Sequence, residues 1–290
     1  MNAMELNYAN VMSLAAPLTA ESDQHHLYAL VDHGAMPGLI VQLNKFNVTW
    51  TSLFDGSRDE GALEVAPILM QIRAGEQMLS YKAVMNWLLA QGRYSSSLLF
   101  LYSPLDTADL ARSLALRLDV ALPDGVEMLL RFFDGRVFEV LMDVLQAEQK
   151  VAFLRPARAW WFVDPLGKLR LCDSWFAETE SPLVPLVLNS AQEAALIDAS
   201  EIDQVAMLLA AVMPSEFESM HEVDRVSFLL KSIATARSYK IVAPNDLTLY
   251  CAMALTHGDG FDRDSPWASR FAKISEGLIT MNDAMQDDYS

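Results

Sequence analysis

The sequence predicts an α/β N-terminal lobe with a mostly parallel sheet, followed by an all-α C-terminal helical lobe. Over the first 177 residues, short apolar runs alternate with segments of helical spacing, which is typical of an α/β layer with parallel strands. After Phe176 the segment AETESPLVPLVLN has two prolines and no helical period, and only helical segments follow it. We therefore predict an α/β lobe over residues 1–177, a linker over 178–189 and a helical lobe over 190–290.

Strands are predicted where short runs of apolar, β-branched and aromatic residues end in turn residues. The run LYALVDHG, which begins at Leu27, ends in Asp and Gly, as a buried strand does where it enters a loop. The run VTWTSLF alternates like a half-buried strand and is followed by the turn pair Asp55-Gly56. The other predicted strands cover residues 97–102, 126–133, 159–163 and 168–172.

Helices are predicted between these strands from the spacing of apolar residues. Asp106 is placed to cap one helix by accepting a hydrogen bond from the amide of Asp109, and leucines follow along one face of that helix. Asp134 opens another helix that extends to about Phe153. The remaining helices of this lobe cover about 36–46 and 76–90.

The second lobe is predicted to be a bundle of four or five helices. Ser190 and Glu193 form a capping box, S-A-Q-E, before a helix that extends to Val212. A second box begins at Ser215. The other predicted helices cover residues 223–239, 246–257 and 267–281.

The chain is acidic and rich in apolar residues at the same time. Its 290 residues include 21 Lys and Arg against 38 Asp and Glu, a formal net charge of −17, and 52% are hydrophobic. This hydrophobic content excludes a disordered chain, and the acidity argues against a nucleic-acid partner because it repels phosphate. The net charge is −8 over residues 1–180 and −9 over 181–290, so both lobes are acidic.

The sequence predicts neither export nor membrane insertion. The N-terminal 20 residues carry Glu5 in place of a basic flank, which argues against a signal peptide. No apolar run approaches the ~18 residues of a membrane span. Cys172 and Cys251 lie far apart and form no CxxC or Cys/His spacing, as is typical of a reducing compartment. We therefore expect a cytoplasmic protein.

The chain contains none of the catalytic, phosphate-binding or zinc-binding motifs GxSxG, GxxxxGK[ST], GxGxxG and HExxH. The aspartates of HGDGFDRDSPW miss the ligand spacing of a calcium loop. The nearest metal-like group comprises Asp23, His25, His26, Asp32 and His33. Adjacent histidines on a strand point to opposite faces, so a turn at the strand end explains this group better. We therefore expect no metal, no cofactor and no enzymatic activity.

The most distinctive local string is RFFDGR, residues 131–136. In a functional interpretation, Arg131 and Arg136 contact a ligand or a partner at the carboxyl edge of the sheet. In a structural interpretation, Asp134 caps the following helix and an Arg–Asp ion pair fixes the turn between strand and helix. We favour the structural interpretation, because paired charges are common at such turns.

Four strings of the first lobe carry a resemblance to a known family: LYALVDHG, SLFDG with APILMQI, SSSLLFLYSP and LLRFFDGRVFEVL. In this order they resemble the core of the type VI secretion effector adaptors, also called effector chaperones of the Tap/TEC type. LNSAQEAALIDAS and ARSYKIVAPNDLTLYCAMALTHGDGFDRDSPW are similar to the helical lobe of that family. The chain departs from the family at Phe133 and Gly135, where the family typically has Tyr and Pro. Losing the preset φ of Pro is expected to loosen this turn.

The resemblance implies a non-enzymatic adaptor that binds a cognate effector toxin and helps load it onto the valine-glycine-repeat spike protein of the secretion machine. Two alternatives stay open. One is an enzyme, a hydrolase or transferase that uses Asp32, His33 and Asp134, and the other is an immunity protein that neutralises a toxin. The candidate partner-binding or structural residues are Asp32, Asp55, Arg131, Phe132, Asp134 and Arg136.

Overall fold

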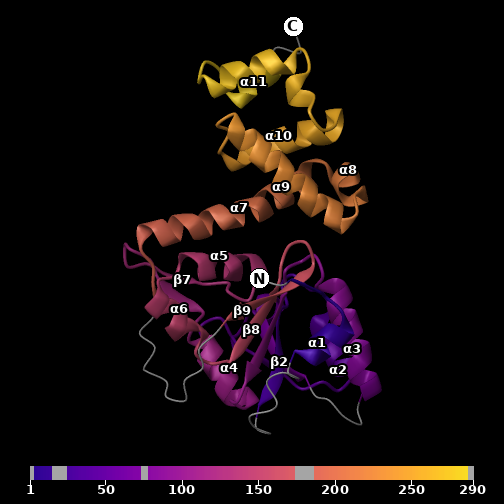
Figure 1. Ribbon diagram of the computed structural model, residues 1–290, viewed down its shortest axis with the longest axis vertical. Helices are drawn as coiled ribbons and strands as arrows, with labels where there is room; N and C mark the ends of the chain where they lie inside the picture. Colours follow the sequence, from indigo (N-terminus) through magenta and orange to yellow (C-terminus); the bar gives the residue numbers. More distant parts are fainter. Residues whose placement is uncertain (1–2, 15–24, 73–77, 174–185, 287–290) are drawn as a thin grey trace. The chain divides into compact units, whose positions relative to one another are not determined.

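Seven strands form the central sheet of the first part of the chain, in the order β1-β9-β8-β5-β2-β4-β3 (Figure 1). This computed structural model describes residues 3–14, 25–72, 78–173 and 186–286. The strands of the sheet are β1 (Met4–Glu5), β2 (His26–Asp32), β3 (Trp50–Ser52), β4 (Pro67–Ile72), β5 (Leu98–Ser103), β8 (Ala159–Val163) and β9 (Lys168–Asp173). β2, β5 and β8 are neighbours at the centre and are buried along almost their whole length, because their residues are apolar on both faces.

The prediction of a mostly parallel sheet is wrong, because every pair of neighbouring strands in this sheet is antiparallel. Strand β2 lies between β4 and β5 and runs antiparallel to both. β4 and β5 are therefore parallel to each other, and helix α3 (Met78–Gln91) connects them. A strand, a helix and a strand in succession typically give this parallel relation, but here β2 separates the two strands. β4 itself is a strand that the sequence pattern did not predict.

Helices cover both faces of the central sheet (Figure 1). One group consists of α1 (Tyr8–Ser13), α2 (Leu39–Lys45) and α3. The other consists of α4 (Thr107–Ala115), α5 (Gly135–Val144) and α6 (Ala147–Leu154). The predicted cap of α4 is confirmed, because Oδ1 of Asp106 accepts the backbone N–H of Asp109 at 2.8 Å.

A second sheet has the order β10-β6-β7 and consists of β10 (Leu186–Val187), β6 (Asp119–Ala121) and β7 (Glu127–Leu129). Its β10·β6 pair is parallel and its β6·β7 pair is antiparallel. Only three residues of the strand predicted over 126–133 therefore form a strand.

The helix predicted from Asp134 to about Phe153 is two helices, α5 and α6. The break lies at Leu145, which has an extended backbone. Gln146 then caps α6, and its backbone N–H donates to Oε1 of Gln149 at 3.0 Å. This reciprocal cap starts a new helix in a segment whose apolar spacing reads as continuous.

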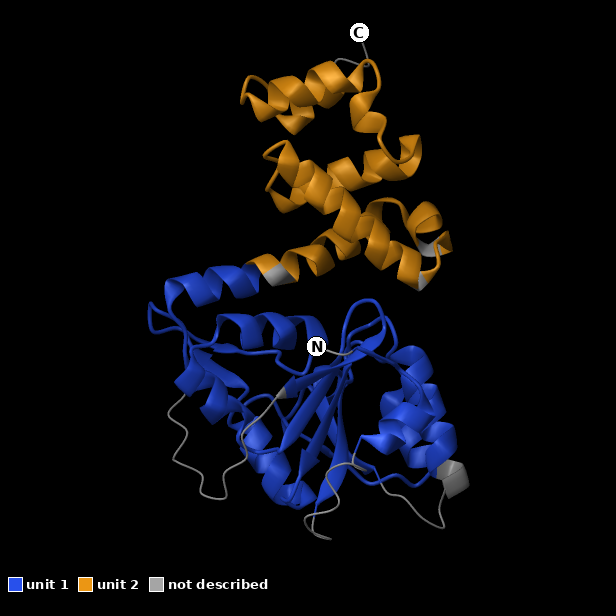
Figure 2. Ribbon diagram, viewed as in Figure 1, with its two compact units in different colours: residues 1–197 blue, residues 198–290 orange. Residues whose placement is uncertain are grey.

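The chain divides into two compact units, residues 1–197 and 198–290 (Figure 2). The boundary falls within helix α7 (Ser190–Val212). Of the predicted linker, residues 178–185 lie outside the described residues, and 186–187 form β10. Among the residues described, no helix is both long and apolar enough to cross a membrane.

The second unit is helical and has its own apolar core. Aromatic side chains of Tyr250, Phe261, Trp267 and Phe271 meet in this core. After α7, its helices are α8 (Pro214–Ser219), α9 (Glu222–Ser238), α10 (Pro244–His257), the short 3-10 helix η2 (Phe261–Arg263), α11 (Trp267–Ser275) and α12 (Met281–Gln286).

The two predicted capping boxes of this region are wrong in detail. The cap of α7 lies one residue earlier than predicted: the backbone N–H of Gln192 donates to Oδ1 of Asn189 at 3.0 Å, and that of Asn189 to Oε1 of Gln192 at 2.9 Å. No side chain caps α8, whose first turn contains Pro214. Proline suits this position, because its missing N–H would have no partner within the helix there.

Candidate functional site

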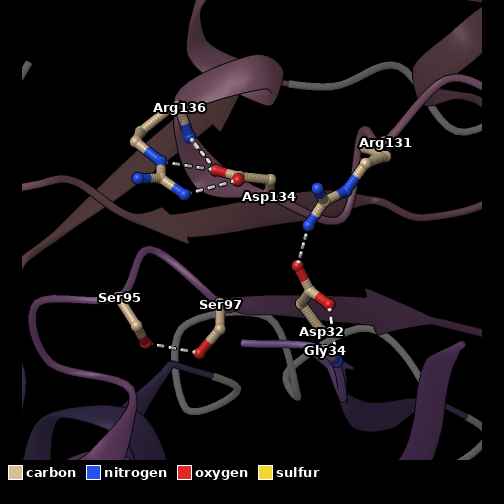
Figure 3. A network of polar contacts seen from close by, with 7 residues as sticks. All are labelled: Asp32, Gly34, Ser95, Ser97, Arg131, Asp134 and Arg136. Atoms are coloured by element: carbon tan, nitrogen blue, oxygen red, sulfur yellow. Dashed lines mark hydrogen bonds and ion pairs between the residues drawn. The ribbon is translucent and has the colours of Figure 1, made fainter. Parts of the chain in front are cut away.

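Three segments that are far apart in the sequence meet at the end of β2 (Figure 3). Asp32 ends β2, Ser96 and Ser97 precede β5, and residues 131–136 lead into α5. The backbone N–H of Asp32 donates to the carbonyl of Ser97 at 2.9 Å, and that of Gly135 donates to the carbonyl of Ser96 at 2.7 Å. These bonds fasten the loop before β5 to both other segments. We call this site the corner; it comprises Asp32, Gly34, Ser95–Ser97 and residues 131–136.

The first ion pair of the corner joins Asp32 to Arg131. Asp32 is 1% exposed, and its Oδ2 accepts Nη2 of Arg131 at 2.7 Å. Its Oδ1 accepts the backbone N–H of Gly34 at 3.0 Å. The side chain of Arg131 is 54% exposed and lies over the ring of Phe133, 5.7 Å from its centroid. A buried carboxylate and an aromatic ring thus hold an arginine that remains open to solvent.

The second ion pair joins Asp134 to Arg136. Oδ1 of Asp134 accepts both the backbone N–H and Nε of Arg136 at 2.9 Å, and Oδ2 accepts Nη2 at 2.7 Å. Asp134 is therefore at once the N-cap of α5 and a bidentate partner of Arg136. Its side chain is buried, and the contacts described occupy both of its oxygens.

Of the other two candidates, one lies in the core and one lies away from the corner. Phe132 is fully buried, and its ring packs edge-on against Phe153 at 5.3 Å between centroids. It therefore contributes to the core that α6 covers. Asp55 is exposed in the turn after β3, and its backbone N–H donates to the carbonyl of Ser52.

Sequence reasoning missed Ser96, which the corner holds in an uncommon conformation. Its φ is +52°, in the left-handed region that disfavours residues with a side chain. Its hydroxyl is buried and has no hydrogen-bond partner among the residues described. The neighbouring hydroxyls of Ser95 and Ser97 bond each other at 2.7 Å. In this conformation the Ser96 carbonyl accepts the backbone N–H of Gly135.

A third buried aspartate, Asp164, lies in the turn after β8 and was also missed. Its Oδ1 accepts the backbone N–H groups of Leu166 and Lys168, and its Oδ2 accepts Nε of Arg170 at 2.8 Å. Arg170 also lies 3.6 Å from Glu139 of α5. Burial raises the pKa of the Glu139 carboxyl, and Arg170 opposes that shift. This network ties α5 to the β8–β9 hairpin.

Of the His and Asp residues in the metal-like group, those that the structure describes form no metal site. Nδ1 of His33 lies 2.7 Å from the carbonyl of Leu63, and the ring of His25 stacks on Tyr102. Asp23 lies outside the described residues. Within the described ranges, no group of three or more His, Cys, Asp or Glu residues is arranged to hold a metal ion.

Comparison with known proteins adds one finding to this geometry. No curated protein and no solved structure matches the chain. Residues 27–152, from β2 into α6 and including the whole corner, match the family model described as "Domain of unknown function (DUF4123)", a domain that is associated with type VI secretion effector adaptors.

Proposed function

We propose that this protein is a non-enzymatic adaptor that binds a type VI secretion effector and helps load it onto the valine-glycine-repeat spike protein. The observation that carries the proposal is the match of residues 27–152 to a domain associated with such adaptors. The protein acts in the cytoplasm of the secreting cell, and neither nucleic acid nor a membrane is a partner.

The side chains that the enzyme alternative would use have other contacts. Asp32 and Asp134 accept hydrogen bonds from arginines and backbone N–H groups. His33 contacts the Leu63 carbonyl. A general base must lie within hydrogen-bond reach of its substrate. Asp32 and Asp134 are 1% and 3% exposed, so their burial supports the non-enzymatic proposal.

Within the corner, Arg131 is the candidate residue for contact with the partner. Its Nη2 binds Asp32, and its other nitrogens form no hydrogen bond with any residue that the structure describes. Arginine is enriched among the residues that dominate binding energy at protein interfaces. Because Asp32 and Phe133 already hold the guanidinium, little side-chain entropy remains to be lost when a partner carboxylate or carbonyl binds it.

The proposal is tested by co-expression with the effector encoded beside it, followed by size-exclusion chromatography. We expect one complex to elute at micromolar concentration. Deleting the adaptor gene should abolish secretion of that effector and leave secretion of the tube protein intact. If the two proteins elute separately and effector secretion is unchanged, the proposal is wrong. If the protein instead protects a cell from the toxin without affecting its export, it is an immunity protein.

We expect Arg131→Ala to weaken partner binding by about tenfold or more, and to lower the free energy of unfolding by about 1–3 kcal/mol. The stability loss is limited because Gly34 still donates to Asp32. The measurement is the dissociation constant of the purified complex, with urea unfolding of the free adaptor alongside. Arg112→Ala is the matched control, because Arg112 is an exposed arginine of α4 that pairs with Asp109 on its own helix. Equal affinities of the two variants would remove Arg131 from the interface.

A further inference from the structure

The second unit contains a cavity of about 260 Å³ between α9, α10 and η2. Its buried residues are Ser232, Tyr250, Ala254, Phe261 and Asp262. Its more exposed rim consists of Lys231, Thr235, Asp259, Gly260 and Arg263. The residues that match DUF4123 end before this unit begins.

Asp262 is a buried carboxylate without a cationic partner. It is 3% exposed, and its Oδ2 accepts the hydroxyl of Tyr239 at 2.6 Å. It forms no ion pair with any residue in the described part of the chain. Burial, followed by the hydrogen bond to Asp262, raises the pKa of Tyr239 to about 12. Burial and the charge of Asp262 also raise the pKa of Tyr250. Both tyrosines therefore stay protonated, and neither neutralises the carboxylate.

Buried charges in proteins are normally paired with an opposite charge or with a metal ion. The rim does not supply that charge. Lys231 is already paired with Asp259 at 2.5 Å, and Arg263 is exposed to water, which screens it. The negative charge of Asp262 in the buried part of the cavity is therefore not balanced by the cations of the rim.

The rest of the lining suits the body of an organic cation. The rings of Tyr250 and Phe261 lie 5.3 Å apart between centroids, and aromatic faces attract guanidinium and ammonium groups. Ser232 is buried and lines the cavity. Its hydroxyl forms no hydrogen bond within the ranges that the structure describes, so it is available as an acceptor for a ligand N–H.

We propose that this cavity binds the guanidinium or primary ammonium group of an organic cation, and that an arginine or lysine side chain of a protein partner supplies it. The cavity is smaller than the ~300–1,000 Å³ of typical small-molecule sites, which suits one side chain. The chain's net charge of −17 attracts basic partners. Binding of the cation stands on the geometry alone, and the choice of a protein as its source rests on the proposed function.

The experiment titrates the full chain with ethylguanidinium chloride at constant ionic strength, followed by NMR. N-ethylurea, which has nearly the same shape and no charge, is the matched probe. We expect saturable binding of ethylguanidinium and none of ethylurea. Asp262→Asn should weaken ethylguanidinium binding by about tenfold or more, and Asp264→Asn should leave it unchanged. Asp264 is an exposed aspartate two residues away that does not line the cavity.

A second variant distinguishes loss of the site from loss of folding. Ala254→Leu fills the cavity while it keeps Asp262, and it should also abolish binding; thermal unfolding of each variant checks the fold. If ethylurea binds as well as ethylguanidinium, or if a folded Asp262→Asn variant binds ethylguanidinium as wild type does, the cation site is refuted.

Capture of the co-expressed effector identifies the source of the cation. We expect Asp262→Asn to reduce effector capture relative to Asp264→Asn. If Asp262→Asn loses ethylguanidinium binding but captures the effector as wild type does, the ligand is a free small cation. The proposal that a partner's side chain supplies the cation is then wrong. If wild type captures no effector, the adaptor proposal fails, whereas the titration result is unaffected.

Discussion

Arg117→Met is expected to lower the free energy of unfolding by about 3 kcal/mol or more. Arg117 is 1% exposed, and its guanidinium donates to backbone carbonyls. Nη1 donates to the carbonyl of Ser113 at 2.5 Å, Nε to that of Phe153 at 2.7 Å and Nη2 to that of Ala152 at 3.0 Å.

These carbonyls belong to the last turns of α4 and α6, which lack partners within their own helices and carry partial negative charge. One guanidinium therefore satisfies the ends of two helices. Methionine fills a similar volume but leaves the buried carbonyls without these donors, each at a cost of about 1–3 kcal/mol.

Urea unfolding followed by tryptophan fluorescence measures this loss. Arg112→Met is the control, because Arg112 lies five residues earlier on α4, is 72% exposed and forms a surface pair with Asp109. Its loss should cost less than about 1 kcal/mol. Arg117→Lys should fall between the two, because an ammonium keeps the charge but cannot span both helix ends. Similar stabilities of the Arg117→Met and Arg112→Met variants would contradict this account.

Arg117 also shows why part of the structure could not be predicted from the sequence. The leucines at 110, 114 and 118 suggest one continuous helix face, and Arg117, seven residues after Leu110, would lie at the edge of that face. The helix instead ends at Ala115, and the chain turns so that Arg117 enters the core. Where a helix ends depends on tertiary contacts with α6, which its own apolar spacing does not encode.

The strands of the central sheet were predictable where burial alone determines their composition. β2, β5 and β8 are buried on both faces and read as continuous apolar runs. Strand direction was not predictable in this way, because a run that is apolar on both faces carries no information about its neighbour. β4 was missed, although Pro67 occupies its first position, where a strand tolerates proline.

The charged residues of the corner were predictable from the sequence, whereas the pairing between its distant segments was not. Polar residues at the ends of apolar runs identified Asp32, Arg131 and Asp134 as candidates. The bond between Asp32 and Arg131 joins positions 99 residues apart, and it depends on the order of strands in the sheet. The Asp134–Arg136 pair is local, and the prediction of a capping aspartate anticipated that part of its geometry.

Gly135→Ala is expected to destabilise the protein by about 1–3 kcal/mol or more. A Cβ at this position would lie 2.5 Å from the carbonyl oxygen of Val163 and 3.2 Å from that of Ser96. Both obstructing atoms belong to the backbone of the central sheet or its connecting loop, so no side chain can rotate away. The start of α5 would have to move, and the bond from the Gly135 N–H to Ser96 would lengthen.

Gly61→Ala is the matched control, because a Cβ there meets no atom within 4 Å and its φ lies outside the left-handed region. It should be neutral or slightly stabilising, since alanine has less entropy to lose on folding.

Gly135→Pro should destabilise the protein more than Gly135→Ala does, because proline adds the same clash and also removes the N–H that binds Ser96. In this chain the close approach of the Val163 carbonyl favours glycine at position 135. Urea unfolding gives the free energy of unfolding of the three variants. If Gly135→Pro is as stable as wild type, α5 can shift away from the sheet and this account is wrong.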